Sequence, residues 1–235
     1  MRTHQQEANV NESSTTGRDI QRLILVPALI TLAVTAARLA GELAHGPRRF
    51  FNPEAGGSGA IVGIVWLAPL FGIYFALKLA AQGQGPKSFL RAIGFSLLGV
   101  ALVYAFGFLG SLLHMQQNFR ARLVYVWTVV AVSALVTLPG WKALFRTLVA
   151  YAYAARVPVA VVMFLAFWRD WGTHYDAVPP DLPEGLGLMG KYFWLGFFPQ
   201  LTFWVGLTVL AGMVLGSITA GIVHLARRHR QPNKS

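Results

Sequence analysis

RLAGELAHGPRRFFNPEAGGSG, residues 38–59, ends one long apolar block and leads into the next. The stretch has an arginine and a glutamate inside the end of the first block, two more arginines in a turn, and a glycine run before the second block. A helix needs about 20 predominantly apolar residues to cross a bilayer. The pattern therefore predicts two membrane helices joined by a polar corner, around which the rest of the chain is organised.

Composition places the chain among integral membrane proteins. Of its 235 residues, 55% are hydrophobic and 12% are charged, whereas a soluble domain has about 25% charged residues. The chain has no cysteine, which excludes disulfides, thiolate metal ligands and a cysteine nucleophile. The net charge of +11 comes from basic residues in short loops and tails, a pattern of membrane topology rather than of nucleic-acid binding. We therefore expect membrane lipids as partners, no nucleic acid and no cofactor.

Six apolar blocks predict an all-α, polytopic transmembrane helix bundle. The spans are expected within one domain, residues 20–226, at residues 23–44, 59–81, 89–113, 123–138, 143–168 and 199–226. The aromatic segment 192–198, which precedes Pro199, is expected to lie at the membrane interface. Residues 1–19 are expected to form a disordered cytoplasmic tail and residues 227–235 a basic one.

The positions of Lys and Arg predict how the spans are oriented. Twelve of the 20 fall on the side of both termini, six fall on the opposite side, and Arg38 and Arg156 lie within spans. The positive-inside rule then predicts that both termini are cytoplasmic. Residues 48–57, 116–122 and the long loop 169–191 fall on the outer side, and loops of that length are often functional. The expected location is a bacterial inner (cytoplasmic) membrane.

Ionisable groups inside spans indicate a candidate site, because each costs about 2.5–3.5 kcal/mol at the bilayer centre unless it is paired or wetted. Arg38 and Glu42 are four residues apart on one helix face and are expected to pair. Arg156 lies midway along the fifth span and is expected to face the bundle interior. One interpretation is a structural ion pair. The other is a transporter-like or lipid-binding bundle, in which the surplus positive charge attracts an anionic small molecule or lipid headgroup. Asn52 and the loop around Asp176 would then form the mouth of an outward-facing cavity.

A second hypothesis is a membrane-embedded hydrolase or transferase. His174 in the outer loop has the chemistry of a general base or metal ligand, and Asp176 is placed to orient it. Two residues apart in a loop is not a recognised metal-ligand spacing, so no metal site is predicted.

The segment GGSGAIVG, residues 56–63, resembles the GxSG segment of rhomboid proteases. The resemblance implies a serine nucleophile at a helix start, here Ser58, paired with a histidine from a later helix. One predicted span precedes Ser58, however, where that family has three, and His224 is expected at the opposite membrane face. We therefore expect Ser58 to cap the second helix.

Small residues recur every four positions in the last span, at Gly212, Gly216 and Ala220. Such a stripe lets another helix approach closely. The expected use is packing within the bundle, and the alternative is a homodimer or a larger complex. An accessory subunit of such a complex is the third functional hypothesis.

Overall fold

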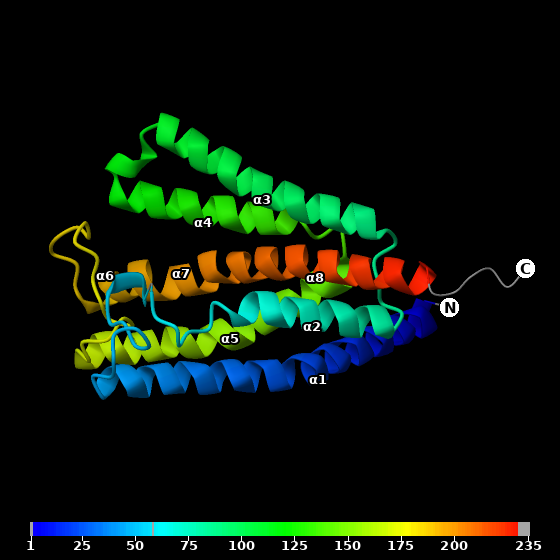
Figure 1. Cartoon of the computed structure of the whole chain (residues 1–235), viewed down its shortest axis with the longest axis horizontal. Helices are drawn as coiled ribbons and strands as arrows, with labels where there is room; N and C mark the ends of the chain where they lie inside the picture. The colour runs from blue at the N-terminus through cyan, green and yellow to red at the C-terminus, as the bar shows by residue number, and fades with distance from the viewer. Residues whose placement is uncertain (1, 58, 230–235) are drawn as a thin grey trace, which may run out of the picture.

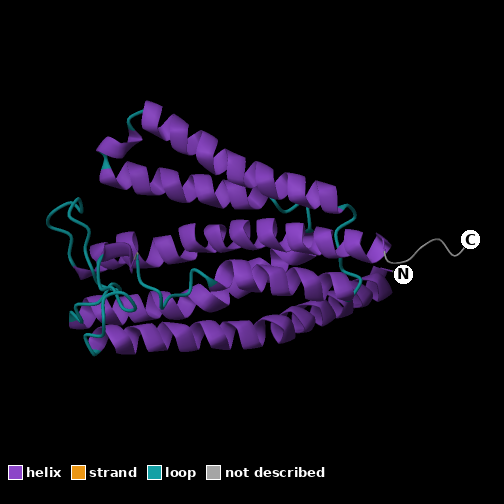
Figure 2. Ribbon diagram, in the orientation of Figure 1, coloured by secondary structure: helices purple, strands orange, loops and turns teal. Residues whose placement is uncertain are grey.

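The molecule is a bundle of long helices. The computed structural model describes residues 2–57 and 59–229, and no strand occurs in those ranges (Figure 2). The elements in chain order are α1 (Arg2–Leu43), η1 (Ala55–Gly57), α2 (Leu67–Ala81), α3 (Phe89–Leu112), η2 (Met115–Gln117), α4 (Phe119–Val136), α5 (Lys142–Arg169), α6 (Leu188–Lys191), η3 (Tyr192–Phe197), α7 (Phe198–Leu201) and α8 (Phe203–His229). The predicted all-α fold class is confirmed.

Within the described residues, five stretches of helix are long and apolar enough to cross a membrane, namely Gly17–Leu43, Phe89–Leu112, Phe119–Val136, Lys142–Arg169 and Leu188–Arg227. The remaining predicted span, residues 59–81, contains only the 15 residues of α2 in helical form. At 1.5 Å per residue α2 rises about 22 Å, which is less than the hydrocarbon thickness of about 30 Å.

The predicted helix start at residue 59 is wrong. Residues 59–66 form turns and bends, and α2 begins at Leu67. The physical reason is the glycine run, since Gly56, Gly57 and Gly59 all have positive φ, which an α-helix excludes. Ser58, the expected cap, lies outside the described residues.

The three predicted outer loops gather at one end of the bundle, on the left in Figure 1, and the start of α1 and the end of α8 lie at the other. This arrangement agrees with the alternation of sides expected from the sequence. Which end faces the cytoplasm stays a prediction.

The N-terminal segment is helical, whereas a disordered tail was expected there. α1 begins at Arg2 and so extends through the segment expected to be a disordered tail. No proline or glycine precedes Gly17 to interrupt the helix, and the apolar part begins at Gly17. α8 ends at His229, and the rest of the expected basic tail lies outside the described residues.

α8 lies at the centre of the bundle and contacts α2, α3, α4 and α5. Its closest neighbour is α2: a Cβ on Gly72 would lie 2.3 Å from the Cα of Gly212, and a Cβ on Gly216 would lie 2.7 Å from the carbonyl oxygen of Gly72. Ala220 is buried too. A helix of the same chain therefore covers the small-residue stripe.

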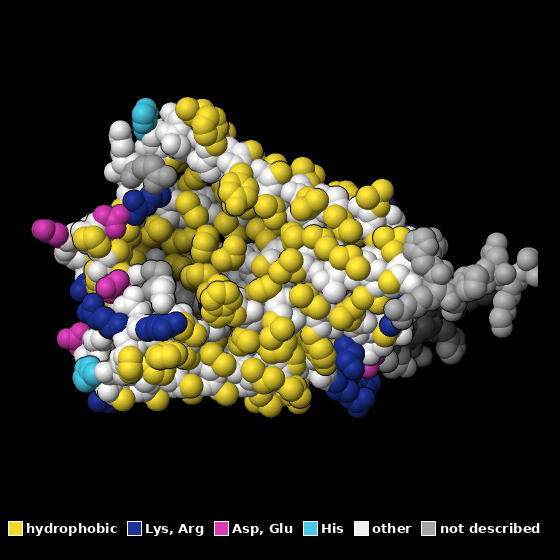
Figure 3. All heavy atoms as spheres, viewed as in Figure 1, with side chains coloured by type: hydrophobic (Ala, Val, Ile, Leu, Met, Phe, Trp, Pro, Cys, Tyr) yellow, Lys and Arg dark blue, Asp and Glu magenta, His cyan; other side chains and the backbone are white. Residues whose placement is uncertain are grey.

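Aromatic packing joins α2 to α5 beside this contact. The ring of Tyr151 meets Phe71 and Phe75 edge-on, each at 5.4 Å between centroids. The Tyr151 hydroxyl hydrogen-bonds the Thr31 hydroxyl of α1 at 2.8 Å. On the face of the molecule that Figure 3 shows, hydrophobic side chains cover the helices and charged groups gather toward the ends. These features define an integral membrane protein.

We predict that Gly72→Ala destabilises the bundle by about 1–3 kcal/mol, because the added methyl group meets helix backbone. Gly94→Ala is the matched control, since a Cβ on Gly94 meets nothing within 4 Å. Alanine there is expected to be neutral or stabilising by about 0.5–1 kcal/mol. The measurement is the thermal unfolding midpoint of both variants in detergent. Equal midpoints would contradict the close α2–α8 contact.

Candidate functional site

The C-terminal part of α1 carries a buried ion pair at the loop end of the bundle. Arg38 is 7% exposed and Glu42 is 5% exposed. The Nε of Arg38 donates to Oε1 of Glu42 at 2.8 Å. The predicted pairing of these two residues, one helical turn apart, is confirmed.

Arg38 also fixes the glycine-rich segment over the end of α1. Its Nη1 donates to the carbonyl oxygen of Val62 at 3.1 Å, and its Nη2 donates to those of Asn52 at 3.1 Å and Gly57 at 3.0 Å. Together with the bond from Nε to Glu42, four of the five N–H groups of the guanidinium donate hydrogen bonds within the protein. Arg38 is therefore mainly a fold-determining residue, with little hydrogen-bonding capacity left for a ligand.

Gly57 is a position where the close approach requires glycine. Its φ is +61°, and a Cβ there would lie 2.7 Å from Nη2 of Arg38 and 2.7 Å from Cδ2 of His174. The absence of a side chain lets the loop, the arginine and the histidine meet at one point.

Glu42 binds His174 as well as Arg38. The backbone N–H of His174 donates to Oε2 of Glu42 at 2.8 Å, and its ring Nδ1 lies 2.6 Å from Oε1 and 2.8 Å from Oε2. A carboxylate only accepts hydrogen bonds, so Nδ1 carries the hydrogen. In the described part of the chain Nε2 has no hydrogen-bond partner. The neutral imidazole therefore presents a free lone pair.

The sequence suggested that Asp176 orients His174, but the structure shows a different role for this carboxylate. Its Oδ1 accepts from the backbone N–H of Thr173 at 2.8 Å and from the Thr173 hydroxyl at 2.7 Å, and its Oδ2 accepts from the N–H of Gly172 at 2.9 Å. Asp176 shapes the turn that presents His174, and the orienting carboxylate is Glu42.

Tyr175 attaches the same turn to α1. Its hydroxyl donates to the carbonyl oxygen of Thr35 at 3.3 Å, and its ring lies 3.8 Å from that of His174. Burial raises the pKa of Tyr175 well above its ordinary value, so the hydroxyl stays a donor. The loop end of α1 is thus bonded to the long loop at two positions.

Asn52 is placed beside this cluster but its side chain faces its own turn. Its Oδ1 accepts from the backbone N–H of Glu54 at 3.3 Å. Its contribution to the cluster is the backbone carbonyl that Arg38 binds.

Arg156, in the middle of α5, is 5% exposed. Its guanidinium lies 4.7 Å from the ring centroid of Trp204, and its Nη1 donates to Oε1 of Gln200 at 3.4 Å. No carboxylate of the described residues pairs with it. Arg156 is thus a buried cation that contacts a neutral amide and an aromatic face.

Gln200 was missed by reasoning from the sequence. It lies in an irregular part of the last helical block, after the π-helical turn η3 and before a break at Thr202. Pro199, whose ring prevents a regular helix hydrogen bond, is the residue that signalled the irregularity. A lone glutamine next to a proline in an apolar block was the available signal.

A cavity of about 450 Å³ lies between α1, α4, α5 and the last helical block. It is lined by three of the six predicted site residues, Arg38, Arg156 and His174, but not by Glu42, Asn52 or Asp176. Its other walls are mainly apolar and aromatic, including Trp127, Trp194 and Trp204. Figure 3 shows the hollow between the α3–α4 hairpin and the rest of the loop end.

The long loop is fastened across the cavity to α4. Ala177 and Pro179 of this loop line the cavity, and the carboxylate of Asp181 pairs with Arg122 of α4. The hydrogen bond from Arg122 lowers the pKa of Asp181, so the pair persists at neutral pH.

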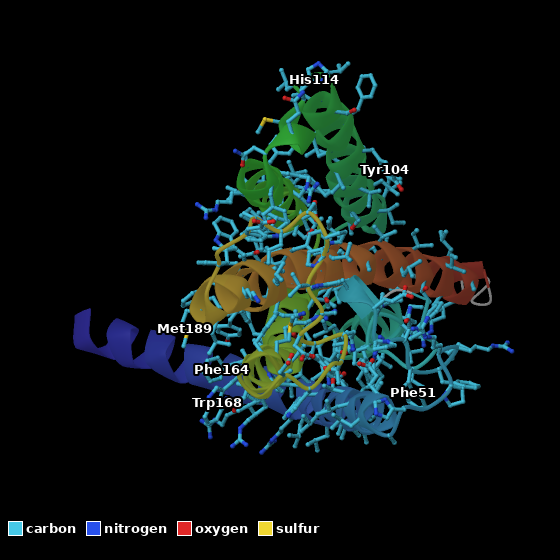
Figure 4. The ribbon with its side chains drawn as sticks, turned by 90° about the vertical axis from the view of Figure 1, so that its left-hand side faces the viewer. Phe51, Tyr104, His114, Phe164, Trp168 and Met189 are labelled. Atoms are coloured by element: carbon cyan, nitrogen blue, oxygen red, sulfur yellow. The ribbon has the colours of Figure 1, made fainter. Side chains whose placement is uncertain are left out.

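The histidines do not assemble a metal site. Among the described residues no group of three or more His, Asp or Glu side chains is placed to hold a metal ion. His114, for example, lies at the tip of the α3–α4 hairpin, away from Phe51 and the end of α1 (Figure 4).

The class of the protein follows from the fold and the cavity: it is a polytopic helical membrane protein with buried charges around a cavity. Comparison with protein-family models, curated proteins and solved structures finds no match to this chain.

Acidification is expected to destabilise the protein through His174. Burial lowers the pKa of His174 below its usual 6.5, and the hydrogen bond to Glu42 opposes this shift in part. The folded state therefore favours the neutral ring, and this stabilisation is present above pH 6.5 and lost as the pH falls. His174→Asn keeps an N–H donor for Glu42 but does not titrate. We predict that the thermal unfolding midpoint of the wild type is lower at about pH 5.5 than at about pH 7.5. The midpoint of the variant is expected to be the same at both pH values. A wild-type midpoint that rises on acidification would contradict this.

Proposed function

We propose that this protein binds an anionic amphiphile, a molecule with a negatively charged headgroup and an apolar chain, in the cavity at its loop end. The observation that carries the proposal is Arg156, a buried guanidinium that lines the cavity without a carboxylate partner among the described residues. A transporter-like or lipid-binding role is the general function that this supports.

Charge at the cavity favours an anion. The charged side chains that line it are Arg38 and Arg156, both cationic, and burial favours the neutral form of His174. Neither Glu42, which pairs with Arg38, nor Asp176, which is bonded within its own turn, lines the cavity. The surplus positive charge is costly in a membrane, by about 2.5–3.5 kcal/mol on insertion scales, unless something neutralises it. Arg38 is already engaged by four acceptors. Arg156 is therefore the group that gains most from an incoming headgroup.

The apolar part of the ligand is inferred from the cavity walls. Trp127 of α4 stacks with Trp194 at 5.7 Å and with Phe198 at 5.9 Å between ring centroids. Val126, Val159 and Phe203 line the same cavity. A mainly apolar pocket with a few polar groups is typical of sites that bury most of a ligand.

The test compares three probes in nanodiscs of phosphatidylcholine. Decanesulfonate has an anionic head and a chain, methanesulfonate has the head alone, and decyltrimethylammonium has a chain of the same length with a positive head. We predict that decanesulfonate binds far more tightly than either of the others. Tight binding of methanesulfonate would instead indicate a site for a free anion.

Arg156→Gln is expected to weaken decanesulfonate binding by about tenfold or more, since hydrogen bonds to charged groups contribute about 1.5–3 kcal/mol. The matched control is Arg169→Gln at the exposed end of α5, where the guanidinium packs on Trp168 outside the cavity. Because Arg156 has no ion-pair partner in the described chain, its replacement is expected to leave the thermal midpoint unchanged or raise it. A variant that is less stable but binds normally would make Arg156 a structural residue and sink the proposal.

A second candidate function is hydrolysis of an ester in the same cavity. It is favoured by the Glu42–His174 contact, which fixes the ring tautomer and leaves Nε2 without a partner in the described part of the chain. His174 also lines the cavity. In this reaction Nε2 takes a proton from water as the water oxygen bonds to the acyl carbon, and the proton passes to the leaving alkoxide when the ester C–O bond breaks. Glu42 replaces Asp176 as the orienting carboxylate of the original hypothesis.

Purified protein with p-nitrophenyl decanoate tests this candidate. We expect His174→Asn to reduce hydrolysis to the background rate if the candidate is correct. Glu42→Gln would then reduce the rate with the pH profile displaced, whereas Arg169→Gln would be normal. Hydrolysis that is unaffected in His174→Asn excludes the histidine as the base.

A bacterial inner membrane with both termini in the cytoplasm is part of the proposal. It is supported by the excess of basic residues on the side of the termini. The cavity would then open toward the outer side of that membrane.

A further inference from the structure

Among the described residues that line the cavity, His174 is the one whose ordinary pKa lies near neutral pH. It lines the cavity together with Arg38 and Arg156. Its Nδ1 is committed to Glu42, while Nε2 has no partner in the described part of the chain. Any proton gained by this ring must therefore be added at Nε2.

We infer that anion binding and proton uptake are coupled at this site: when a headgroup enters the cavity, His174 gains one proton on Nε2 and donates it as a hydrogen bond to the anion. The inference rests on the proposed function, because it requires an anion in the cavity. It adds to that function a dependence of affinity on pH.

The charges around the ring explain why the empty site holds it neutral. From α1 it is faced by Arg38 and by Glu42, and from its own turn by Tyr175 and by Asp176, which is bonded to Thr173. From α5, Arg156 shares the cavity. Burial and the nearby Arg38 both oppose a further positive charge, and burial is the larger of these two effects on the pKa of His174.

An anion reverses this balance. It adds a negative charge within the cavity and offers an acceptor for an Nε2–H group, and both changes favour the imidazolium. Glu42 keeps its hydrogen bond to Nδ1–H in both protonation states, so the ring has no need to turn. The bound state thus binds one more proton than the free state, and by linkage affinity must rise as the pH falls.

Calorimetry of decanesulfonate binding to the full-length protein in phosphatidylcholine nanodiscs measures this coupling. A sulfonate does not titrate in this range, so protons taken up belong to the protein. Titrations at one pH in two buffers with different heats of ionisation give the number of protons bound. We expect an uptake approaching one proton at neutral pH and an affinity that falls by up to about tenfold per pH unit as the pH rises.

His174→Asn separates this role from a structural one. The variant retains an N–H donor for Glu42 but has no Nε2, so its affinity is expected to be independent of pH with no proton uptake. His114→Asn, at the far tip of the α3–α4 hairpin, is the matched control and should keep the wild-type pH dependence (Figure 4).

Three results would overturn the inference in distinguishable ways. Normal binding of decanesulfonate by the wild type without proton uptake leaves the proposed function in place and removes the coupling. Persistent pH dependence in a folded His174→Asn variant assigns the proton to another group. Absence of decanesulfonate binding at every pH removes the proposed function and the coupling together.

Discussion

The buried carboxylate of Glu42 is the interaction on which the loop end of this protein depends. It accepts hydrogen bonds from Arg38 in its own helix and from His174, which is 132 residues further along the chain. Arg38 in turn binds three carbonyl oxygens of the glycine-rich segment. One carboxylate therefore connects α1 to two separate loops, and a buried charge with that many partners is costly to leave half satisfied. The shape of the cavity wall follows from this network.

The two intramembrane arginines have different roles for the same reason. Arg38 donates to a carboxylate and three carbonyl oxygens, so its charge is largely compensated by the fold. Arg156 contacts an amide and an aromatic ring, and no carboxylate of the described residues pairs with it. Stability of the fold explains why Arg38 is buried but not why Arg156 is, because an uncompensated charge in a bundle is a cost rather than a gain. That asymmetry is why the binding proposal is centred on Arg156 and treats Arg38 as part of its support.

Sequence patterns predicted those features of the structure that depend on residues close together in the chain. The helical class and the gathering of three loops at one end followed from apolar blocks, and the Arg38–Glu42 pair followed from a spacing of four residues on one helix. The partner of His174 was out of reach, because Glu42 is distant in the sequence and Asp176 is the nearer carboxylate. Asp176 is used by the turn itself, through hydrogen bonds to Gly172 and Thr173 that no periodic pattern reveals. Glycines read as the start of a helix were instead needed for positive φ and for the close approach of Arg38.

Two segments of irregular backbone connect the fold to the proposed function. Residues 59–66 form turns and bends before the short α2, and the last helical block contains a π-helical turn followed by a break. Backbone polar groups of this kind are tolerated within a bilayer only where protein buries them or where they line a polar cavity. Both irregular segments border the same cavity, through Gly63 and Ile64 on one side and Leu195 and Gln200 on the other. A continuous helix in either place would satisfy its own backbone hydrogen bonds. π-Helical turns, moreover, occur frequently at functional sites. The two departures from regular helix therefore support the same proposal as Arg156, with which no carboxylate of the described residues pairs, namely that this cavity binds a ligand.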